Sequence, residues 1–199
     1  LEWTTVAKGN SKLALDTFQE AYHVACIQGR TIADAIDQSD SSIRPLDVRC
    51  GDFHRRLTIA GNQSSVYGNP KAVTDGGKAA DEALANSSKS RPIAAAALRS
   101  ALGSSKYNFP LDQLPEGVNW TKNSNWLFDI NVLFPDFYLS LRPNYAQAYN
   151  FRPISHNETL FEARVYYPEM NTAGGRFFQE YMKVALRDVL LEDLSTIER

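Results

Sequence analysis

Three side chains that can bind a metal or move a proton lie close together near the start of the chain. Asp16, Glu20 and His23 recur at three- and four-residue spacings, which places them on neighbouring turns of a predicted helix that runs from Lys12 to about Cys26. Carboxylates and an imidazole beside an apolar face are costly to bury without a partner, so this helix is a candidate binding site. Its apolar residues at helical spacings, expected to form one buried side, are Leu13, Leu15, Phe18, Tyr22, Val24 and Ile27.

The far end of the chain supplies a further carboxylate. After a break at two glycines, residues 176–198 predict one long helix with an apolar side. Asp193 follows Leu190 by three positions and Val189 by four, which places it on that apolar side. Since a carboxylate buried there needs a cation, Asp193 is another candidate metal ligand.

The elements between these two helices must bring their side chains together. Residues 3–6 predict a short strand, and residues 46–60 predict a hairpin with its turn at Gly51-Asp52. Residues 66–124 carry many turn signals around an Ala-rich helix over 92–102, and this region can shape a substrate pocket or be surface filler. Four β-rich runs then predict an antiparallel meander with a largely aromatic core, over 126–134, 137–142, 146–153 and 159–167.

The N-terminal run resembles the iron-site helix in the catalytic domain of Rieske-type aromatic-ring-hydroxylating oxygenase alpha subunits. That family usually has N-W-K-x-x-x-D-x-F-x-E-x-Y-H-x-x-x-x-H. Ser11 stands here where the family has Trp, and Gln28 stands where the second iron-ligating His belongs. The family's third ligand is the Asp of E-D-x-x-x-x-E in the last long helix, which matches Asp193. Positions of the first motif that match in register are Asn10, Lys12, Asp16, Phe18, Glu20, Tyr22 and His23.

The resemblance implies an α+β fold of the helix-grip (START-like) type, in which a curved antiparallel sheet wraps around a long C-terminal helix. Residues 1–199 would form a single catalytic domain. A Rieske [2Fe–2S] cluster needs paired Cys-x-His and Cys-x-x-His segments, whereas Cys26 and Cys50 are the only cysteines here. We therefore expect the N-terminal Rieske domain, and its cluster, to be absent from this chain.

The resemblance also assigns roles to the candidate residues. His23 and Asp193 would hold one mononuclear Fe(II), an arrangement that leaves positions for dioxygen and substrate. Gln28 would occupy the remaining ligand position as a weak neutral donor, so the iron would be held weakly or not at all. Glu20 matches the acidic residue that bridges to the Rieske domain of a neighbouring subunit, which implies a head-to-tail homotrimer of the full-length protein. Asp16 matches a position that holds the helix and the site in place.

The residues alone are compatible with more than one function. Glu20 and Asp16 can be helix N-terminal acids that the helix dipole favours. The leading hypothesis is a mono- or dioxygenase that uses dioxygen to hydroxylate or dealkylate an aromatic or small apolar substrate. Its electrons would come from a ferredoxin or reductase through the missing domain, so this chain alone would be inactive. The alternatives are a non-catalytic small-molecule-binding module and a purely structural subunit, which would have no cavity.

Composition excludes several classes of function. A length of 199 residues with 43% hydrophobic and 22% charged residues is ordinary for a globular domain. A net charge of -2 gives no electrostatic basis for binding nucleic acid or an anionic membrane. No apolar run is long enough to span a membrane, and the first residues do not resemble a signal peptide. With two cysteines, a reducing, cytoplasmic location is the expectation.

Overall fold

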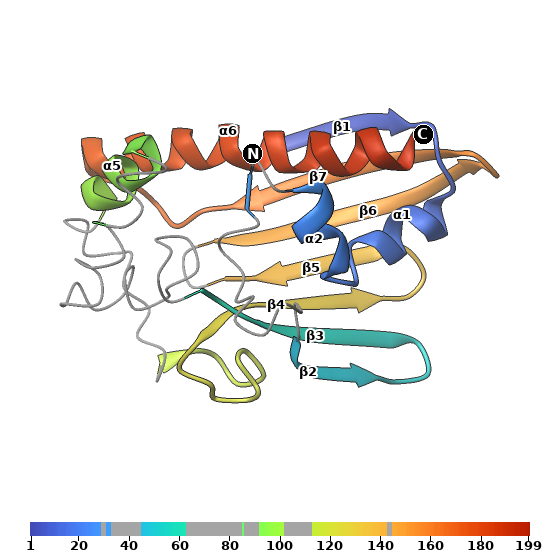
Figure 1. Ribbon diagram of the computed structural model, residues 1–199, viewed down its shortest axis with the longest axis horizontal. Helices are drawn as coiled ribbons and strands as arrows, with labels where there is room; N and C mark the ends of the chain where they lie inside the picture. The colour runs from blue at the N-terminus through green and yellow to red at the C-terminus, as the bar shows by residue number, and fades with distance from the viewer. Residues whose placement is uncertain (29–30, 33–44, 63–84, 86–91, 102–112, 143–144) are drawn as a thin grey trace.

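The computed structural model describes residues 1–28, 31–32, 45–62, 85, 92–101, 113–142 and 145–199. In this part of the chain, seven strands form one antiparallel sheet in the order β1-β7-β6-β5-β4-β3-β2, with the long helix α6 lying along its β1–β7 side (Figure 1). The elements are β1 (Glu2–Ala7), α1 (Ser11–Thr17), α2 (Tyr22–Ile27), β2 (Pro45–Cys50), β3 (His54–Ala60), α5 (Pro92–Ala101), β4 (Trp126–Leu133), β5 (Phe137–Leu141), β6 (Ala146–Ser155), β7 (Glu158–Tyr166) and α6 (Ala173–Ile197).

The sheet confirms the predicted meander. Strands β2 to β7 each pair with the next in sequence, and β1 closes the order by pairing with β7, so that Trp3 lies opposite Ala163. Buried and more exposed residues alternate along β7, which is the period of a strand with one covered face. The structure is thus the expected curved antiparallel sheet with a C-terminal helix, the helix-grip architecture.

Helix α6 begins where its sequence provides a cap. The Thr172 hydroxyl accepts a hydrogen bond from Gly175 N at 3.0 Å, which satisfies one of the free N–H groups of the first turn. The helix buries one side against the sheet, and Asp193 is the one charged residue on that side among the described residues. The buried positions are Gly175, Phe178, Met182, Leu186, Val189, Leu190, Asp193 and Leu194.

An aromatic cluster ties the N-terminal segment to the sheet. The Phe18 ring lies 5.2 Å from Phe151 and 5.7 Å from Tyr149, measured between ring centroids. It also lies 6.1 Å from Phe161, and all four rings are buried. Burying one such ring contributes roughly 1.5–3 kcal/mol, so this cluster fixes where the chain enters α2. The prediction that these aromatic residues form core is confirmed.

The prediction of one continuous helix from Lys12 to Cys26 is wrong. The chain forms two short helices, α1 and α2, with a break between Thr17 and Tyr22. The break has a local cause, because the Glu20 carboxylate accepts hydrogen bonds from the backbone N–H groups of Tyr22 and His23 and so begins a second helix. The prediction of one buried side is also wrong in part, since Leu13 and Tyr22 are 58% and 74% exposed.

The middle of the chain is described only in part. The predicted Ala-rich helix is present as α5, which packs against α6. The prediction that residues 66–124 shape a pocket falls largely on residues 66–84, 86–91 and 102–112, which lie outside the described residues. No helix among the described residues is long and apolar enough to cross a membrane.

Candidate functional site

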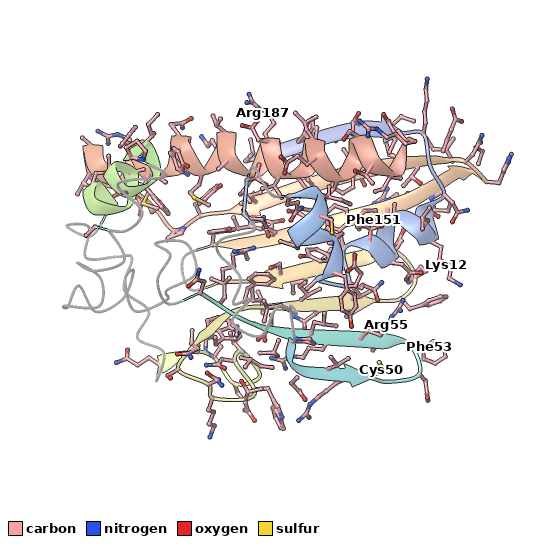
Figure 2. The ribbon with its side chains drawn as sticks, in the orientation of Figure 1. Lys12, Cys50, Phe53, Arg55, Phe151 and Arg187 are labelled. Carbon is pink, nitrogen blue, oxygen red and sulfur yellow. The ribbon has the colours of Figure 1, made fainter. Side chains whose placement is uncertain are left out.

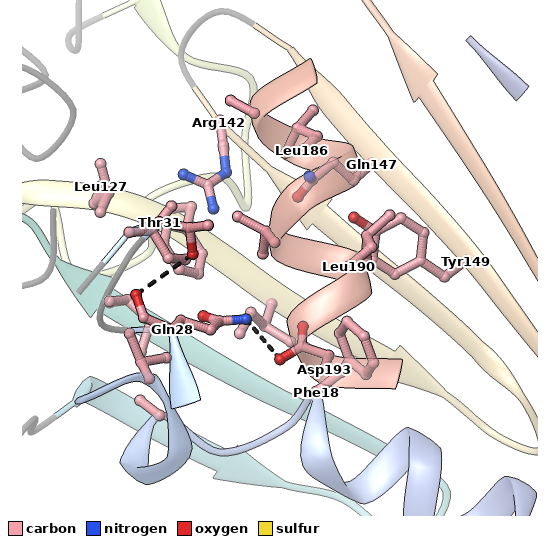
Figure 3. A pocket seen from close by; sticks show the side chains of 18 of the residues that line it. Phe18, Gln28, Thr31, Leu127, Arg142, Gln147, Tyr149, Leu186, Leu190 and Asp193 are labelled. Carbon is pink, nitrogen blue, oxygen red and sulfur yellow. Dashed lines mark hydrogen bonds between the residues drawn. The ribbon is translucent and has the colours of Figure 1, made fainter. Parts of the chain in front are cut away.

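Three candidate ligand residues from opposite ends of the chain meet inside the protein. His23 Nε2 lies 3.7 Å from Asp193 Oδ1, and Gln28 Nε2 donates a hydrogen bond to the same oxygen at 2.7 Å (Figure 3). The Gln28 and Asp193 side chains are almost completely buried. Helix α2 and helix α6 therefore bring an imidazole, an amide and a carboxylate to one point.

The end of helix α2 explains how His23 and Gln28 reach the same partner. On a regular helix, residues five apart point in directions about 140° apart. Gln28 is the C-cap of α2, with φ −94° and ψ 25°, so its backbone has already left the helical conformation. This departure lets the Gln28 side chain turn towards Asp193 on α6.

Glu20 orients the imidazole of His23. Its carboxylate accepts from His23 N at 3.1 Å and also contacts His23 Nδ1. A carboxylate beside Nδ1 favours the tautomer that carries its proton there, which leaves the lone pair of Nε2 directed at Asp193. The Glu20 side chain is 34% exposed, whereas His23 is 11% exposed, so Glu20 links the buried site to the surface.

Burial makes Asp193 an unusual carboxylate. Desolvation raises its pKa to about 7, while the hydrogen bond from Gln28 lowers it and the nearby charges of Glu192 and Glu20 raise it. A buried carboxylate that resists ionisation is stabilised by a cation or by hydrogen-bond donors. Here the Gln28 amide is one such donor.

Asp16 does not join this cluster. Its carboxylate pairs with Arg55 Nη2 at 3.0 Å, and its side chain is 41% exposed. Figure 2 shows Arg55 towards the end of the sheet that carries the β2–β3 turn, away from α6. Asn10 caps α1, since its side-chain oxygen accepts from Lys12 N, and its amide donates to His156 O at 2.9 Å. Asp16 and Asn10 therefore hold α1 in place and do not line a cavity.

The cluster lies on the wall of a cavity of about 210 Å³ between α2, α6 and the sheet. Its walls are mainly apolar and aromatic, with a few polar side chains, as is usual for small-molecule sites. Its size is below the ~300–1,000 Å³ of drug-sized pockets, which favours a small ligand. The apolar lining includes Phe18, Val24, Ile59, Leu127, Phe128, Ile130, Leu186, Val189 and Leu190.

Sequence reasoning missed the polar residues of this cavity that come from the sheet. Arg142 follows β5 directly, and Gln147 is a buried polar residue in an otherwise apolar stretch of β6. The sequence signal that could have found Gln147 is a polar residue inside an otherwise apolar strand.

Two buried tyrosines lie side by side in the sheet. Tyr138 and Tyr149 stack in parallel with their ring centroids 4.9 Å apart. Burial raises the pKa of Tyr138 to about 12 and that of Tyr149 well above its usual value. Both phenols are therefore neutral at pH 7.

The whole chain, residues 1–199, matches the family described as the ring hydroxylating alpha subunit (catalytic domain). The chain belongs to this family, which confirms the resemblance read from its two terminal motifs. The family's members are Rieske-type non-haem iron oxygenases.

Two solved structures illustrate the shared fold. The quaternary ammonium Rieske monooxygenase CntA has a TM-score of 0.55 and 12% sequence identity, over 100% of this chain and 37% of that protein. Naphthalene 1,2-dioxygenase from Rhodococcus sp. has a TM-score of 0.56 and 12% identity, over 99% of this chain and 42% of that protein. The chain thus spans well under half the length of these oxygenases. Comparison with curated protein sequences finds no significant match.

His23 and Asp193 are close enough together to share one divalent metal ion. Two ligands at about 2.0–2.2 Å from a metal can be up to about 4.4 Å apart, so the separation between His23 Nε2 and Asp193 Oδ1 is compatible with a shared ion. Gln28 Oε1 is buried and accepts no hydrogen bond within the described residues. No group of three or more His, Cys, Asp or Glu side chains there is arranged to hold a metal, so a third strong ligand is absent from this part of the chain.

Proposed function

We propose that this chain is the iron- and substrate-binding domain of a Rieske-type oxygenase, which uses dioxygen to hydroxylate or dealkylate a small aromatic or apolar substrate. The observation that carries the proposal is the meeting of His23 and Asp193, from opposite ends of the chain, on the wall of an apolar cavity. One imidazole and one carboxylate beside a substrate-sized space are part of the donor set of non-haem iron oxygenases.

In this proposal His23 Nε2 and Asp193 would hold Fe(II), and Gln28 stands at the position of a second imidazole. Bound Fe(II) would supply the activation of dioxygen beside the substrate. An amide oxygen is a weaker ligand than an imidazole, and the Gln28 amide already bonds to the carboxylate that the metal needs. The proposal therefore includes weak metal binding by the parent chain.

The other residues of the site prepare it for this role. Glu20 holds the His23 ring with Nε2 facing Asp193, and its partial exposure suits the proposed contact with a Rieske domain in a neighbouring subunit. Asp16 keeps α1 against β3 through Arg55 and so supports the start of the site. The apolar lining of the cavity excludes water and holds the body of the substrate.

The proposal extends to the parts that this chain does not contain. Residues 1–199 would act as one catalytic domain, with electrons delivered from a [2Fe–2S] cluster in a Rieske domain outside this sequence and supplied by a ferredoxin or reductase. The full assembly would be a homotrimer in the cytoplasm, and the isolated chain would have no turnover.

A second candidate function is a non-catalytic, metal-free binding domain for small apolar molecules. The hydrogen bond from Gln28 to Asp193 favours it, because the bond gives the buried carboxylate a partner without any metal. The cavity itself serves both functions.

Metal analysis separates the two functions. The parent chain, Gln28→His and Gln113→His would be loaded with Fe(II) without oxygen, desalted and analysed for iron. Gln113 is exposed and makes the matched control. The oxygenase proposal predicts close to one iron per chain in Gln28→His, clearly less in the parent and in Gln113→His, and loss of the gain when His23→Ala is added. Equal, negligible iron in all variants would contradict it and support the binding domain.

A further inference from the structure

Arg142 brings a positive charge to the cavity that contains the His23–Asp193 pair. Its guanidinium carbon lies 4.0 Å from the centroid of the Phe128 ring and 5.3 Å from that of Tyr145. Within the described residues no ion pair joins Arg142 to a carboxylate, although Glu20, Asp188 and Asp193 also line the cavity. Its Nε is buried and has no hydrogen-bond partner there.

Within the described residues, no hydrogen bond or ion pair occupies the hydrogen-bonding edge of the Arg142 guanidinium. Aromatic rings stack on the flat faces of a guanidinium, whereas its five N–H groups point outward in the plane and match a carboxylate. Arg142 is half-buried, and partial burial of a cation without a counter-ion is unfavourable, a cost that the two aromatic rings offset only in part. An arginine placed this way is suited to an anionic ligand that enters the cavity.

The cavity has two polar regions separated by apolar walls. Figure 3 shows Arg142, Gln147 and Leu186 towards one end and the Gln28–Asp193 pair towards the other, with Leu190 on the helix between them. Gln147 is buried and lines the same cavity, so its amide adds a second polar group to the lining. A ligand that satisfies both the charge and the apolar walls carries one anionic group on an apolar body.

We propose that Arg142 binds the carboxylate of a small monocarboxylic acid, whose apolar body extends through the cavity towards His23 and Asp193. The claim that such an acid is the substrate rests on the proposed oxygenase function. Binding of the acid by Arg142 needs no iron. The bidentate geometry of guanidinium and carboxylate makes Arg142 the residue that selects acids over neutral molecules of the same shape.

Calorimetric titration of the metal-free chain tests the inference with two matched pairs of probes. These are benzoate against benzamide, and 3-phenylpropanoate against 3-phenylpropanamide. We expect at least one acid to bind about 10–100-fold more tightly than its amide, since hydrogen bonds to a charged group are stronger than those to a neutral one. The preference should disappear in Arg142→Gln and survive in reduced form in Arg142→Lys.

The control variant is Arg164→Gln, because Arg164 is an exposed arginine paired with Glu2 outside the cavity. It should retain the preference for acids. Folding of each variant is checked by circular dichroism, and Arg142→Lys keeps the test valid where Arg142→Gln does not fold. Acids that bind no more tightly than their amides, or a preference that survives in Arg142→Gln, would overturn the inference. An acid preference without any iron uptake by Gln28→His would leave it standing while the oxygenase proposal fails.

Discussion

Gln28 Nε2 donates a 2.7 Å hydrogen bond to Asp193 Oδ1, joining the end of α2 to α6 across 165 residues of sequence. The same carboxylate oxygen faces His23 Nε2 at 3.7 Å. In the proposed metal site, the amide and the metal therefore compete for one oxygen. The hydrogen bond stabilises the metal-free fold and, for the same reason, would weaken metal binding in the proposed site.

Replacing Gln28 by Leu should destabilise the metal-free chain. The substitution removes the donor and leaves the Asp193 carboxyl group buried without this partner, which costs about 1–3 kcal/mol. Urea unfolding measures the change in the free energy of unfolding. Gln113→Leu, at an exposed position, should change it by less than about 0.5 kcal/mol.

A double-mutant cycle shows whether the loss comes from this pair. Replacing both partners by apolar groups is nearly neutral, so adding Asp193→Leu to Gln28→Leu should recover much of the stability. If the two losses simply add, the hydrogen bond is not what couples α2 to α6.

Glu20→Gln should weaken metal binding more than it weakens the fold. The amide oxygen can still accept from the backbone N–H groups of Tyr22 and His23, so we expect the free energy of unfolding to fall by less than about 1 kcal/mol. The His23 ring loses its carboxylate partner, and losses of this kind lower metal affinity about 10–100-fold. Titration with Fe(II) in the Gln28→His background measures the affinity.

The control for this prediction is Glu180→Gln, since Glu180 is an exposed acid paired with Lys183 three residues further along α6. Its substitution should leave the metal affinity unchanged. An affinity in Glu20→Gln equal to that in the control would mean that Glu20 only caps α2.

The sequence predicted the fold well where one face of an element is buried. The alternating pattern of β7 and the apolar side of α6 each reflect a single covered face, and both elements are present as expected. The prediction failed between α1 and α2, because the break depends on hydrogen bonds that the Glu20 carboxylate accepts from the backbone N–H groups of Tyr22 and His23. Hydrophobic periodicity carries no information about such a bond.

The candidate site was predictable in its residues but not in its contacts. The resemblance singled out His23, Gln28 and Asp193, and the fold brings these three together. The sequence could not show that the Gln28 amide would bond to Asp193. It also gave no reason to select Arg142, because an arginine at the end of a strand is usually solvated.

Tyr138 should make the chain sensitive to alkaline pH. Burial raises its pKa from 10.0 to about 12, while the positive charge of Arg142 lowers it in part. The folded state holds the phenol proton of Tyr138 more tightly than the unfolded state does. The resulting contribution to the free energy of unfolding is complete below pH 10 and is lost as pH rises towards 12. It amounts to about 3 kcal/mol at most.

Free energies of unfolding measured from pH 9 to 12 test whether stability falls as the pH rises. Tyr138→Phe has no phenol to ionise, so its stability should fall less steeply over that range than the stability of the parent chain. Tyr166→Phe is the control, because Tyr166 is 57% exposed. Parallel pH profiles for the parent and Tyr138→Phe would contradict the assignment.

Asp129→Asn should strongly destabilise the chain. The Asp129 carboxylate is completely buried and accepts from Arg56 Nη2 at 2.7 Å and from Thr58 Oγ1 at 2.8 Å. It also accepts from Asn119 N at 2.8 Å and from Trp126 Nε1 at 3.2 Å. An amide cannot accept from all four donors and leaves Arg56 without its counter-charge, which costs about 3–5 kcal/mol.

Asp47→Asn provides the comparison, since Asp47 pairs with Arg49 at a more accessible position on β2 and should contribute less than about 1 kcal/mol. Asp129 lies between Phe128 and Ile130, which line the cavity, and it bonds to β3 and to the turn at Asn119. Loss of its charge should therefore loosen this wall of the cavity as well as the fold. Thermal unfolding and benzoate titration of the two variants measure both effects. An Asp129→Asn variant as stable as Asp47→Asn would show that β4 is held by its strand pairing alone.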